Sequence, residues 1–452
     1  MSTSRGNGPE TSAVDPIADG ANSYDAVPYS VNAFPQTRPD RLAAIAALFG
    51  LEAPPPRRCR VLELACASGG NLIPLALSSP ESTFVGVDLS QRQIADGQSV
   101  VGQLGLGNVE LKPMSIIDVG REFGTFDYIL AHGVYSWVPP EVQEQILEIC
   151  GRNLSAQGVA YVSYNTLPGW HARGAIREML WYHTERFTDP AERIREARQL
   201  LSFLAASAKQ GDGGYGLLLR HELTVLARTP DTYLLHEHLE EFNEPLYFHQ
   251  FAERAASKGL QYLGEAHVGA MMAAQFGAQA EQTLRQLSPD LLHMEQYMDF
   301  LRNRMFRQTL LCHDDVSLDY VLRPAAVKTF YIASPLRAAA DDAAPSAKTE
   351  PPSSGGARLV THDPLMKAAM GHLSKMWPLS VSFADLCSAA RAQLGHSTSS
   401  PLPAGTSATT AASADVLAAR LLNGHAAGWV EFSLGEPNFV IEVSERPLAS
   451  PY

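Results

Sequence analysis

The chain has 452 residues, of which 45% are hydrophobic, and its formal net charge is −13. At about 150 residues per domain, this length predicts two or three domains. With this negative net charge, the sequence shows no dense cluster of basic residues, which argues against a nucleic-acid partner. The sequence has neither a secretory apolar segment near Met1 nor a run of about 18 apolar residues, so we expect a cytoplasmic protein without membrane insertion.

The cysteines and histidines give no metal-binding pattern, and we predict no metal. Five cysteines are widely spaced and form no CxxC pair, which favours reduced thiols. His236, His238 and His249 lie close together in the sequence but lack the HExxH spacing of zinc enzymes. Their glutamate neighbours fit a solvated helix face instead.

The first third of the chain predicts an alternation of strands and helices. Residues 1–22 are small and polar and are predicted to be disordered. A helix is expected from Pro39 to Phe49, where Gly50 ends it. The expected strands are 60–65, 83–88, 109–114, 126–133 and 158–165, with helices from about 71, from 90 to 104 and from 139 to 150. Such alternation predicts an α/β, Rossmann-like domain with a parallel sheet over residues 23–170.

The remaining two thirds have a different pattern. Residues 171–337 show mainly helical periodicity and are predicted to form a separate helical middle domain. A low-complexity linker is expected at 338–360. Residues 361–452 are predicted to form a small winged-helix-like α+β domain, interrupted by a disordered loop at 396–415. Its expected elements are a helix at 416–423 and two strands, WVEFS (429–433) and FVIEVS (439–444).

The strongest functional signal is VLELACASGGN (61–71), where the first strand turns into the first helix. Small residues in this turn, Ala65, Ser68 and Gly69 among them, allow a ligand to approach the backbone, and the helix start offers free N–H groups. Glu63, at the end of the strand, is placed to attract a cation. Taken alone, such a turn is also compatible with close packing of a helix on a sheet.

Asp88 adds a second element to this site. It ends the next strand and can accept hydrogen bonds from both hydroxyls of a ribose, and we assign the following Leu89 to the same site. A plain helix N-cap is the alternative role for Asp88. Because ELACASGG does not fit the GxGxxG pattern of nicotinamide enzymes, Glu63 and Asp88 together favour a different nucleoside cofactor.

At these residues the sequence resembles class I S-adenosylmethionine-dependent methyltransferases. Outside the turn, a narrower resemblance links it to bacterial methyltransferases with a methyltransferase regulatory domain, which include rickettsial protein lysine methyltransferases that act on outer-membrane proteins. The segments that carry this resemblance are 24–51, 164–171, 234–251, 259–266 and 297–313.

The resemblance implies S-adenosylmethionine as the cofactor and assigns further contacts to it. Glu63 would face the ammonium of the methionine moiety, and His132 and Gly133 would lie beside the sulfonium. The adenine contact stays open between Ser115, the backbone at Ile116, and Asp118, all in the loop after the third strand.

Several residues are candidates for contacts with the substrate. Tyr135 and Trp137 follow the fourth strand, with a hydrophobic lid as the alternative role. His171, which follows Asn165 and Trp170 after the fifth strand, could be a general base or a hydrogen-bonded structural histidine. Two tyrosines could close over the cofactor or simply pack, Tyr24 and Tyr29. Arg302, Arg304 and Arg307 are expected to form salt bridges with Asp299, with an anion-binding patch as the alternative.

The sequence thus predicts a methyltransferase that moves a methyl group by in-line displacement. A protein lysine side chain is the preferred acceptor, on an outer-membrane or other bacterial protein. A small-molecule O- or N-methyltransferase and a non-catalytic cofactor-binding protein remain alternatives, and a homodimer is compatible with the sequence. HGVYSW (132–137) stands where nucleobase N-methyltransferases have an NPPY-type motif, which argues against a nucleobase substrate.

Overall fold

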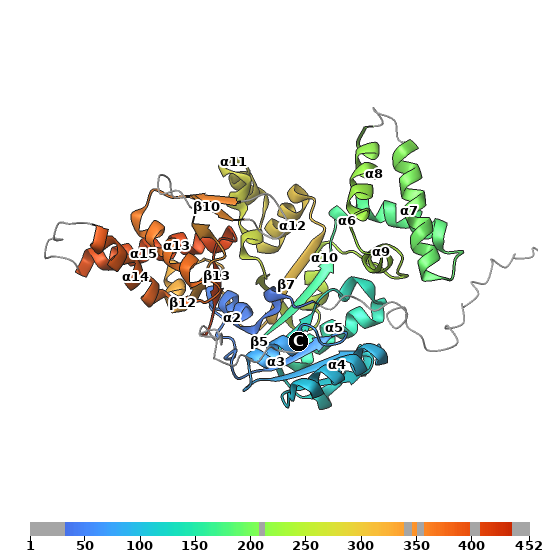
Figure 1. Cartoon of the computed structure of the whole chain (residues 1–452), viewed down its shortest axis with the longest axis horizontal. Coiled ribbons are helices and arrows are strands. Elements are labelled where there is room, and N and C mark those ends of the chain that lie inside the picture. The colour runs from blue at the N-terminus through green and yellow to red at the C-terminus, as the bar shows by residue number, and fades with distance from the viewer. Residues whose placement is uncertain (1–31, 208–212, 339–345, 350–356, 398–406, 436–452) are drawn as a thin grey trace, which may run out of the picture.

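The fold is known from a computed structural model that describes residues 32–207, 213–338, 346–349, 357–397 and 407–435. Its centre is a seven-stranded sheet in the order β3-β2-β1-β4-β5-β7-β6 (Figure 1). The strands are β1 (Arg60–Leu64), β2 (Thr83–Asp88), β3 (Val109–Pro113), β4 (Phe126–Ala131), β5 (Leu154–Asn165), β6 (Leu260–Glu265) and β7 (Phe306–His313). The first five strands are parallel, as predicted, and β7 runs antiparallel to both of its neighbours.

Helices cover both faces of this sheet, which explains why its strands read as nearly continuous apolar runs. The helices are α2 (Pro39–Leu48), α3 (Leu72–Ser78), α4 (Gln91–Leu104), α5 (Pro140–Asn153) and α10 (Phe248–Ala256). Alternate residues of each strand serve the two faces: Val61 packs in the cluster with α2 and α3, whereas Leu62 packs in the cluster with α5 and α10. The α/β fold class and the first five strands are confirmed.

The middle of the chain differs from the predicted separate helical domain. Four helices do form a unit with its own apolar core, which projects away from the sheet (Figure 1). They are α6 (Gly169–Thr184), α7 (Pro190–Ser207), α8 (Gly213–Leu226) and α9 (Asp231–His238). The chain then returns through α10 to the central sheet, where β6 and β7 flank α11 (Ala278–Leu287) and α12 (Leu291–Arg302). The sheet therefore continues well past residue 170, and the predicted boundary there is wrong.

Buried charges explain why β6 and β7 were not predicted as strands. Arg307 in β7 is fully buried, and its guanidinium lies 2.7 Å from both Glu265 in β6 and Asp299 in α12. Glu295, also in α12, lies 3.0 Å away. Charged residues at these positions disturb the apolar pattern by which a buried strand is recognised. Arg304 joins the network through Glu265 and Asp299, so two of the three arginines expected to pair with Asp299 do so.

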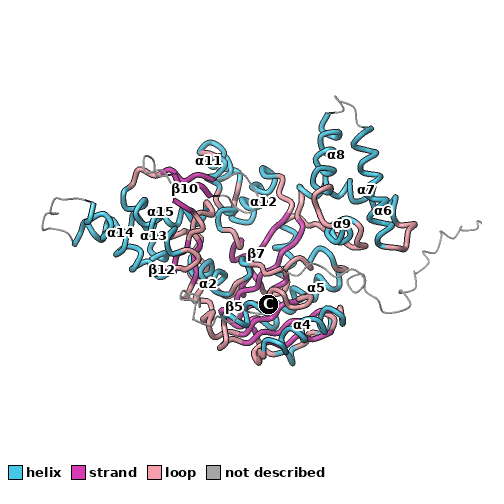
Figure 2. The backbone as a smooth tube through the Cα atoms, in the orientation of Figure 1, coloured by secondary structure: helices cyan, strands magenta, loops and turns pink. Residues whose placement is uncertain are grey.

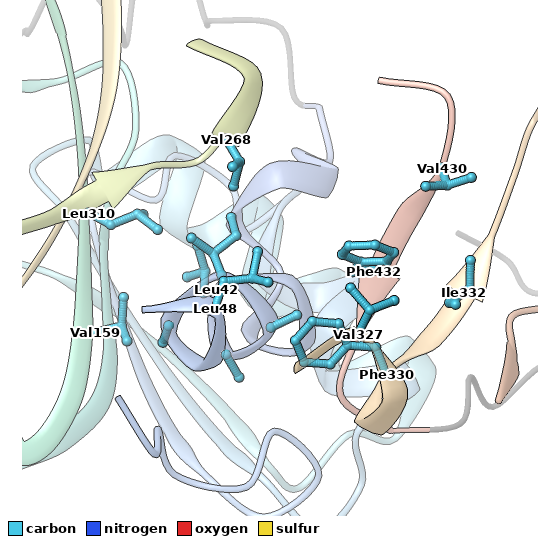
Figure 3. Close-up of a cluster of buried hydrophobic side chains, with 14 of the residues drawn as sticks. Leu42, Leu48, Val159, Val268, Leu310, Val327, Phe330, Ile332, Val430 and Phe432 are labelled. Atoms are coloured by element: carbon cyan, nitrogen blue, oxygen red, sulfur yellow. The ribbon is translucent and has the colours of Figure 1, made fainter. Parts of the chain in front are cut away.

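The C-terminal region packs on α2, which in turn packs on the large sheet, so it shares a core with the rest of the molecule. Its elements are η7 (Pro324–Thr329), β8 (Tyr331–Ala333), α13 (Pro364–Met376), β12 (Val381–Ser382), α14 (Phe383–Ser397), α15 (Ser407–Ala426) and β13 (Glu431–Ser433). Figure 3 shows Leu42 and Leu48 of α2 between Val159 and Leu310 of the large sheet on one side and Phe432 on the other. Arg41 also forms an ion pair with Glu431.

Two expectations for this region need correction. Strands β9 (Arg337–Ala338), β10 (Ser346–Thr349) and β11 (Ala357–Val360) form an antiparallel sheet where an unstructured linker was predicted (Figure 2). Helix α15 begins at Ser407, inside the predicted loop 396–415. The strand expected at 429–433 is present as β13, and the one expected at 439–444 lies outside the described residues, as does the segment 1–22.

The buried charge network yields a stability prediction. In Arg307→Met, three buried carboxylates each lose one ion pair, and breaking a buried pair costs about 3–5 kcal/mol of unfolding free energy. Arg195→Met is the matched control, because Arg195 pairs with Glu192 and Glu196 at the surface, where a pair contributes about 0–1 kcal/mol. Urea titration should show a much lower midpoint for the first variant only. Equal midpoints would mean that the network does not hold β7 in place.

Candidate functional site

The turn after β1 has an unusual backbone. Ala65, Ala67 and Gly69 all have positive φ, at 58°, 50° and 77°. For alanine this left-handed conformation costs roughly 1–2 kcal/mol, so the surrounding contacts must impose it. The Cys66 N–H donates to the Val87 carbonyl at 3.1 Å, and the Ala67 N–H donates to an Asp88 carboxylate oxygen at 2.8 Å. Strain of this kind is typical of ligand-binding loops.

Helix α4 and strand β2 approach the turn unusually closely, and glycines permit it. A Cβ atom on Gly97 would lie 2.4 Å from the Ser68 carbonyl oxygen, and one on Gly86 would lie 2.6 Å from the Cys66 sulfur. The conformation of the turn therefore depends on two glycines outside the motif itself. Neither glycine was predicted to belong to the site, although an isolated glycine within a helix, such as Gly97, is a signal for such an approach.

Glu63 is buried below the turn, with 4% of its surface exposed. One carboxylate oxygen accepts a hydrogen bond from the Asn71 side chain at 2.9 Å. The other has no hydrogen-bond partner among the described residues. Burial raises the pKa of Glu63 to about 8, and the charge of Asp88 adds to the rise, while the Asn71 hydrogen bond opposes it. A buried, orphaned carboxylate oxygen fits the ammonium group of an S-adenosylmethionine methionine moiety.

Asp88 occupies the end of β2, as predicted. Its two oxygens accept hydrogen bonds from the Ala67 N–H at 2.8 Å and the Ser90 N–H at 2.9 Å. These two amides orient the carboxylate at the end of β2, where contacts to ribose hydroxyls are expected. Ser90, not Asp88, is the N-cap of α4, since its side chain accepts from the Gln93 N–H. Leu89 is 64% exposed beside the carboxylate, as a residue that covers a bound nucleoside would be.

The loop after β3 lies next to Asp88, because the Met114 N–H donates to the Asp88 carbonyl at 2.9 Å. The Ser115 hydroxyl caps a 3-10 turn by accepting from the Ile117 N–H. Ile116 is buried and Asp118 is exposed. The three candidate adenine contacts thus lie in the loop that follows β3, beside the end of β2.

His132 follows β4 and is held by a contact network that the sequence analysis did not predict. Its Nδ1 lies 2.8 Å from the Tyr161 hydroxyl, and its ring contacts that of Phe34, with centroids 3.9 Å apart and planes tilted by 38°. Burial lowers the pKa of His132 to about 4, so the imidazole is neutral near pH 7. Gly133, at φ 68°, donates its N–H to the Ser163 hydroxyl at 2.8 Å.

Asn71 connects the buried Glu63 to the segment that carries Phe34. Its side-chain oxygen accepts from the Phe34 N–H at 3.0 Å, and its side-chain nitrogen donates to the Thr37 hydroxyl at 3.0 Å. Residues 34–37 therefore lie across the edge of the site. Asn71 belongs to the predicted turn (61–71). Nothing in the sequence predicted its contact with Thr37, which lies 34 residues earlier.

The predicted substrate residues do not converge on one point. Tyr135 is fully buried, with its ring packed edge-on against Phe251, so it is a core residue and not an exposed acceptor contact. Trp137 is half-buried and meets Trp170 edge-on at 6.1 Å. His171 is exposed, and its Nε2 lies 3.1 Å from the Tyr247 hydroxyl. The remaining candidates lie elsewhere: Asn165 is buried against Asn243, and Tyr24 and Tyr29 fall outside the described residues.

Within the described ranges, no group of three or more His, Cys, Asp or Glu side chains could hold a metal ion. His236 pairs with Glu240 at 2.7 Å, and His249 contacts Gln296 at 3.0 Å. His238 is buried, which lowers its pKa to about 3. None of the described helices is long and apolar enough to cross a membrane.

The fold and the site define an S-adenosylmethionine-dependent methyltransferase, and comparisons with known proteins agree. A family of methyltransferase domains matches residues 62–160, and a family described as a predicted methyltransferase regulatory domain matches residues 230–313. The structure of PKMT2 from Rickettsia typhi in complex with AdoHcy is 32% identical, with a TM-score of 0.79, over 94% of this chain and 80% of that one. The chain belongs to the methyltransferases that carry a methyltransferase regulatory domain.

Two curated relatives come from Rickettsia prowazekii. The uncharacterized protein RP789 is 44% identical over 311 residues, or 69% of this chain and 56% of the relative. The uncharacterized protein RP028 is 42% identical over 241 residues, or 53% of this chain and 96% of the relative. The match to RP789 therefore spans little more than half of that protein's length.

The role of Asp88 can be tested by calorimetry. Asp88→Ala removes a charged acceptor, and a hydrogen bond to a charged group contributes about 1.5–3 kcal/mol. The affinity for S-adenosylhomocysteine should therefore fall by at least about tenfold. Glu110→Ala, in the exposed part of β3, is the control and should bind as the wild type does. Unchanged affinity in Asp88→Ala would refute the assigned site.

The raised pKa of Glu63 predicts a pH dependence of cofactor affinity. An ammonium binds the ionised carboxylate, but below pH 8 the free protein holds Glu63 mainly protonated. Affinity should therefore rise between pH 6 and pH 8, by up to about tenfold per pH unit if only the ionised form binds. Glu63→Gln should bind more weakly, with a flatter profile over the same range. Parallel profiles for the two proteins would show that Glu63 does not face the ammonium.

Proposed function

We propose that this protein transfers a methyl group from S-adenosylmethionine to the side-chain amine of a lysine in a protein substrate. The observation that carries the proposal is the aromatic surrounding of His132 at the carboxyl end of β4, where Phe34 and Tyr161 contact its imidazole. The match to PKMT2 of Rickettsia typhi over nearly the whole chain supports it, as does the resemblance to rickettsial protein lysine methyltransferases. This resemblance suggests an outer-membrane or other bacterial protein as the substrate. We place this protein itself in the cytoplasm.

When bound, S-adenosylmethionine supplies an activated methyl group on a positively charged sulfur. The chain's own residues must then hold the cofactor, admit the acceptor and exclude water. Glu63, on β1, would hold the ammonium of the methionine moiety, and Asp88, at the end of β2, would hold the ribose. His132 lies at the neighbouring strand end, where an acceptor would meet the methyl group.

The charge state of His132 suits an amine acceptor. The attacking nitrogen uses its lone pair to form the N–C bond while the S–C bond breaks, so a lysine ammonium must first lose its proton to solvent. A cationic imidazole at this position would repel both the sulfonium and the ammonium. Because burial lowers the pKa of His132 to about 4, the side chain adds no such charge.

The acceptor can be identified by transfer of radiolabelled methyl groups from S-adenosylmethionine into a bacterial lysate separated into protein and small-molecule fractions. We expect the label in protein, recovered after acid hydrolysis as methylated lysine, and at least about tenfold less label with Asp88→Ala. Glu110→Ala should label as the wild type does. Label confined to small molecules, or to another amino acid, would contradict the proposal.

A further inference from the structure

The segment matched by the regulatory-domain family contributes a side chain to the site. Phe306, the first residue of β7, is 39% exposed. Its ring meets His132 edge-on, with the centroids 6.3 Å apart and the planes at 83°. Phe306 pairs with Asn165 at the end of β5, so it lies at the same sheet edge as the end of β4. A residue of segment 230–313 thus stands directly beside the candidate reaction site.

The position of Phe306 is fixed by its neighbour in the chain. Arg307 is fully buried and bonded to Glu265, Glu295 and Asp299, and its guanidinium lies 3.8 Å from the centroid of the Phe248 ring. Successive side chains of a strand point to opposite faces. Because the buried charges hold Arg307 on one face, Phe306 is held on the other, toward His132.

Phe34 and Phe306, which are far apart in the sequence, both contact the imidazole of His132. The Phe34 ring lies 3.9 Å from the imidazole at a tilt of 38°, and the Phe306 ring meets it edge-on at 6.3 Å. Both hydrogen bonds of the imidazole to described residues use Nδ1, toward Tyr161 and Ser163. Nε2 is therefore the ring nitrogen that can contact the amine of the substrate.

Exposed apolar surface continues outward from Phe306. Met305 is 41% exposed and Phe300 is 46% exposed. Phe300 meets Tyr247 edge-on at 6.0 Å, and Tyr247 contacts the exposed His171. Most of these exposed side chains also come from segment 230–313.

We propose that Phe306 is a specificity-determining residue for the acceptor: its ring, beside His132, receives the aliphatic stem and amine of the substrate lysine and guides them to His132. The inference rests on the proposed function and assigns an acceptor-binding role to the segment named as regulatory. Aromatic rings suit this ligand, because their faces attract an ammonium by about 0.5–2 kcal/mol and their apolar surface packs against methylene groups.

Binding of n-butylamine, which has the same four-carbon amine as lysine, tests the site without turnover. Saturation-transfer NMR would compare the wild type and Phe306→Ala, each saturated with S-adenosylhomocysteine. We expect the amine signal to fall at least about threefold in Phe306→Ala and to survive in Phe306→Tyr, which keeps the ring. No butylamine binding to the wild type, or equal binding to the alanine variant, would overturn the inference.

Steady-state kinetics with the labelled lysine protein identified above give the second readout. In Phe306→Ala the KM for that protein should rise about five- to tenfold, with a smaller change in kcat and the same cofactor affinity. Leu287→Ala is the matched control, because Leu287 is 60% exposed in the same segment but lies in α11. An unchanged KM in Phe306→Ala would overturn the inference. A wild type that labels no lysine at all would instead refute the proposed function, and the butylamine result would still stand by itself.

Discussion

The buried guanidinium of Arg307 is the interaction on which the arrangement of the site depends. It joins β6, β7 and α12 through Glu265, Glu295 and Asp299, in a volume with no solvent to screen the charges. Burial alone would raise the pKa of Glu265, but the attraction of Arg304 and Arg307 outweighs it, so the pKa is lowered. The pKa of Glu295 rises to about 7 because its burial is less completely offset. Such a network tolerates few alternative geometries, and it therefore sets where β7 begins.

The same network explains how a segment described as regulatory can belong to the catalytic sheet. β7 lies between β5 and β6, so removing it would leave β5 as an unpaired edge and separate β6 from the sheet. The segment is thus a structural part of the methyltransferase fold, and the four-helix unit α6–α9 is an insertion between β5 and the last two strands. This topology places Phe306 at the reacting edge as a direct consequence of the strand order.

The sequence predicted the first five strands because each is an apolar run bounded by clear turn signals. It also placed Glu63, Asp88 and His132 at adjacent strand ends, because parallel strands bring their carboxyl ends to one edge. It could not predict contacts between distant segments, such as Phe34 with His132 or Asn71 with Thr37, since periodicity carries no information on tertiary neighbours. The role of Tyr135 could not be predicted for the same reason. A tyrosine after a strand has the same sequence pattern whether it lines a site or packs in the core, as Tyr135 does beside Phe251.

Helix α2 gives the C-terminal region a way to influence the site. The helix follows directly on residues 34–37, which Asn71 anchors beside Glu63, and its apolar side chains pack against both Leu310 of β7 and Phe432 of β13. Gly269 fits so closely against the Ala426 carbonyl that a Cβ atom would lie 1.9 Å from it. Because packed interfaces deform little, a displacement of α15 or β13 would be transmitted to α2 and so to Phe34. The positions of Phe34 and Phe306 beside His132 therefore depend on two regions outside the first five strands. Phe306 depends on β7, and Phe34 depends on the C-terminal region, which contacts α2 through β13.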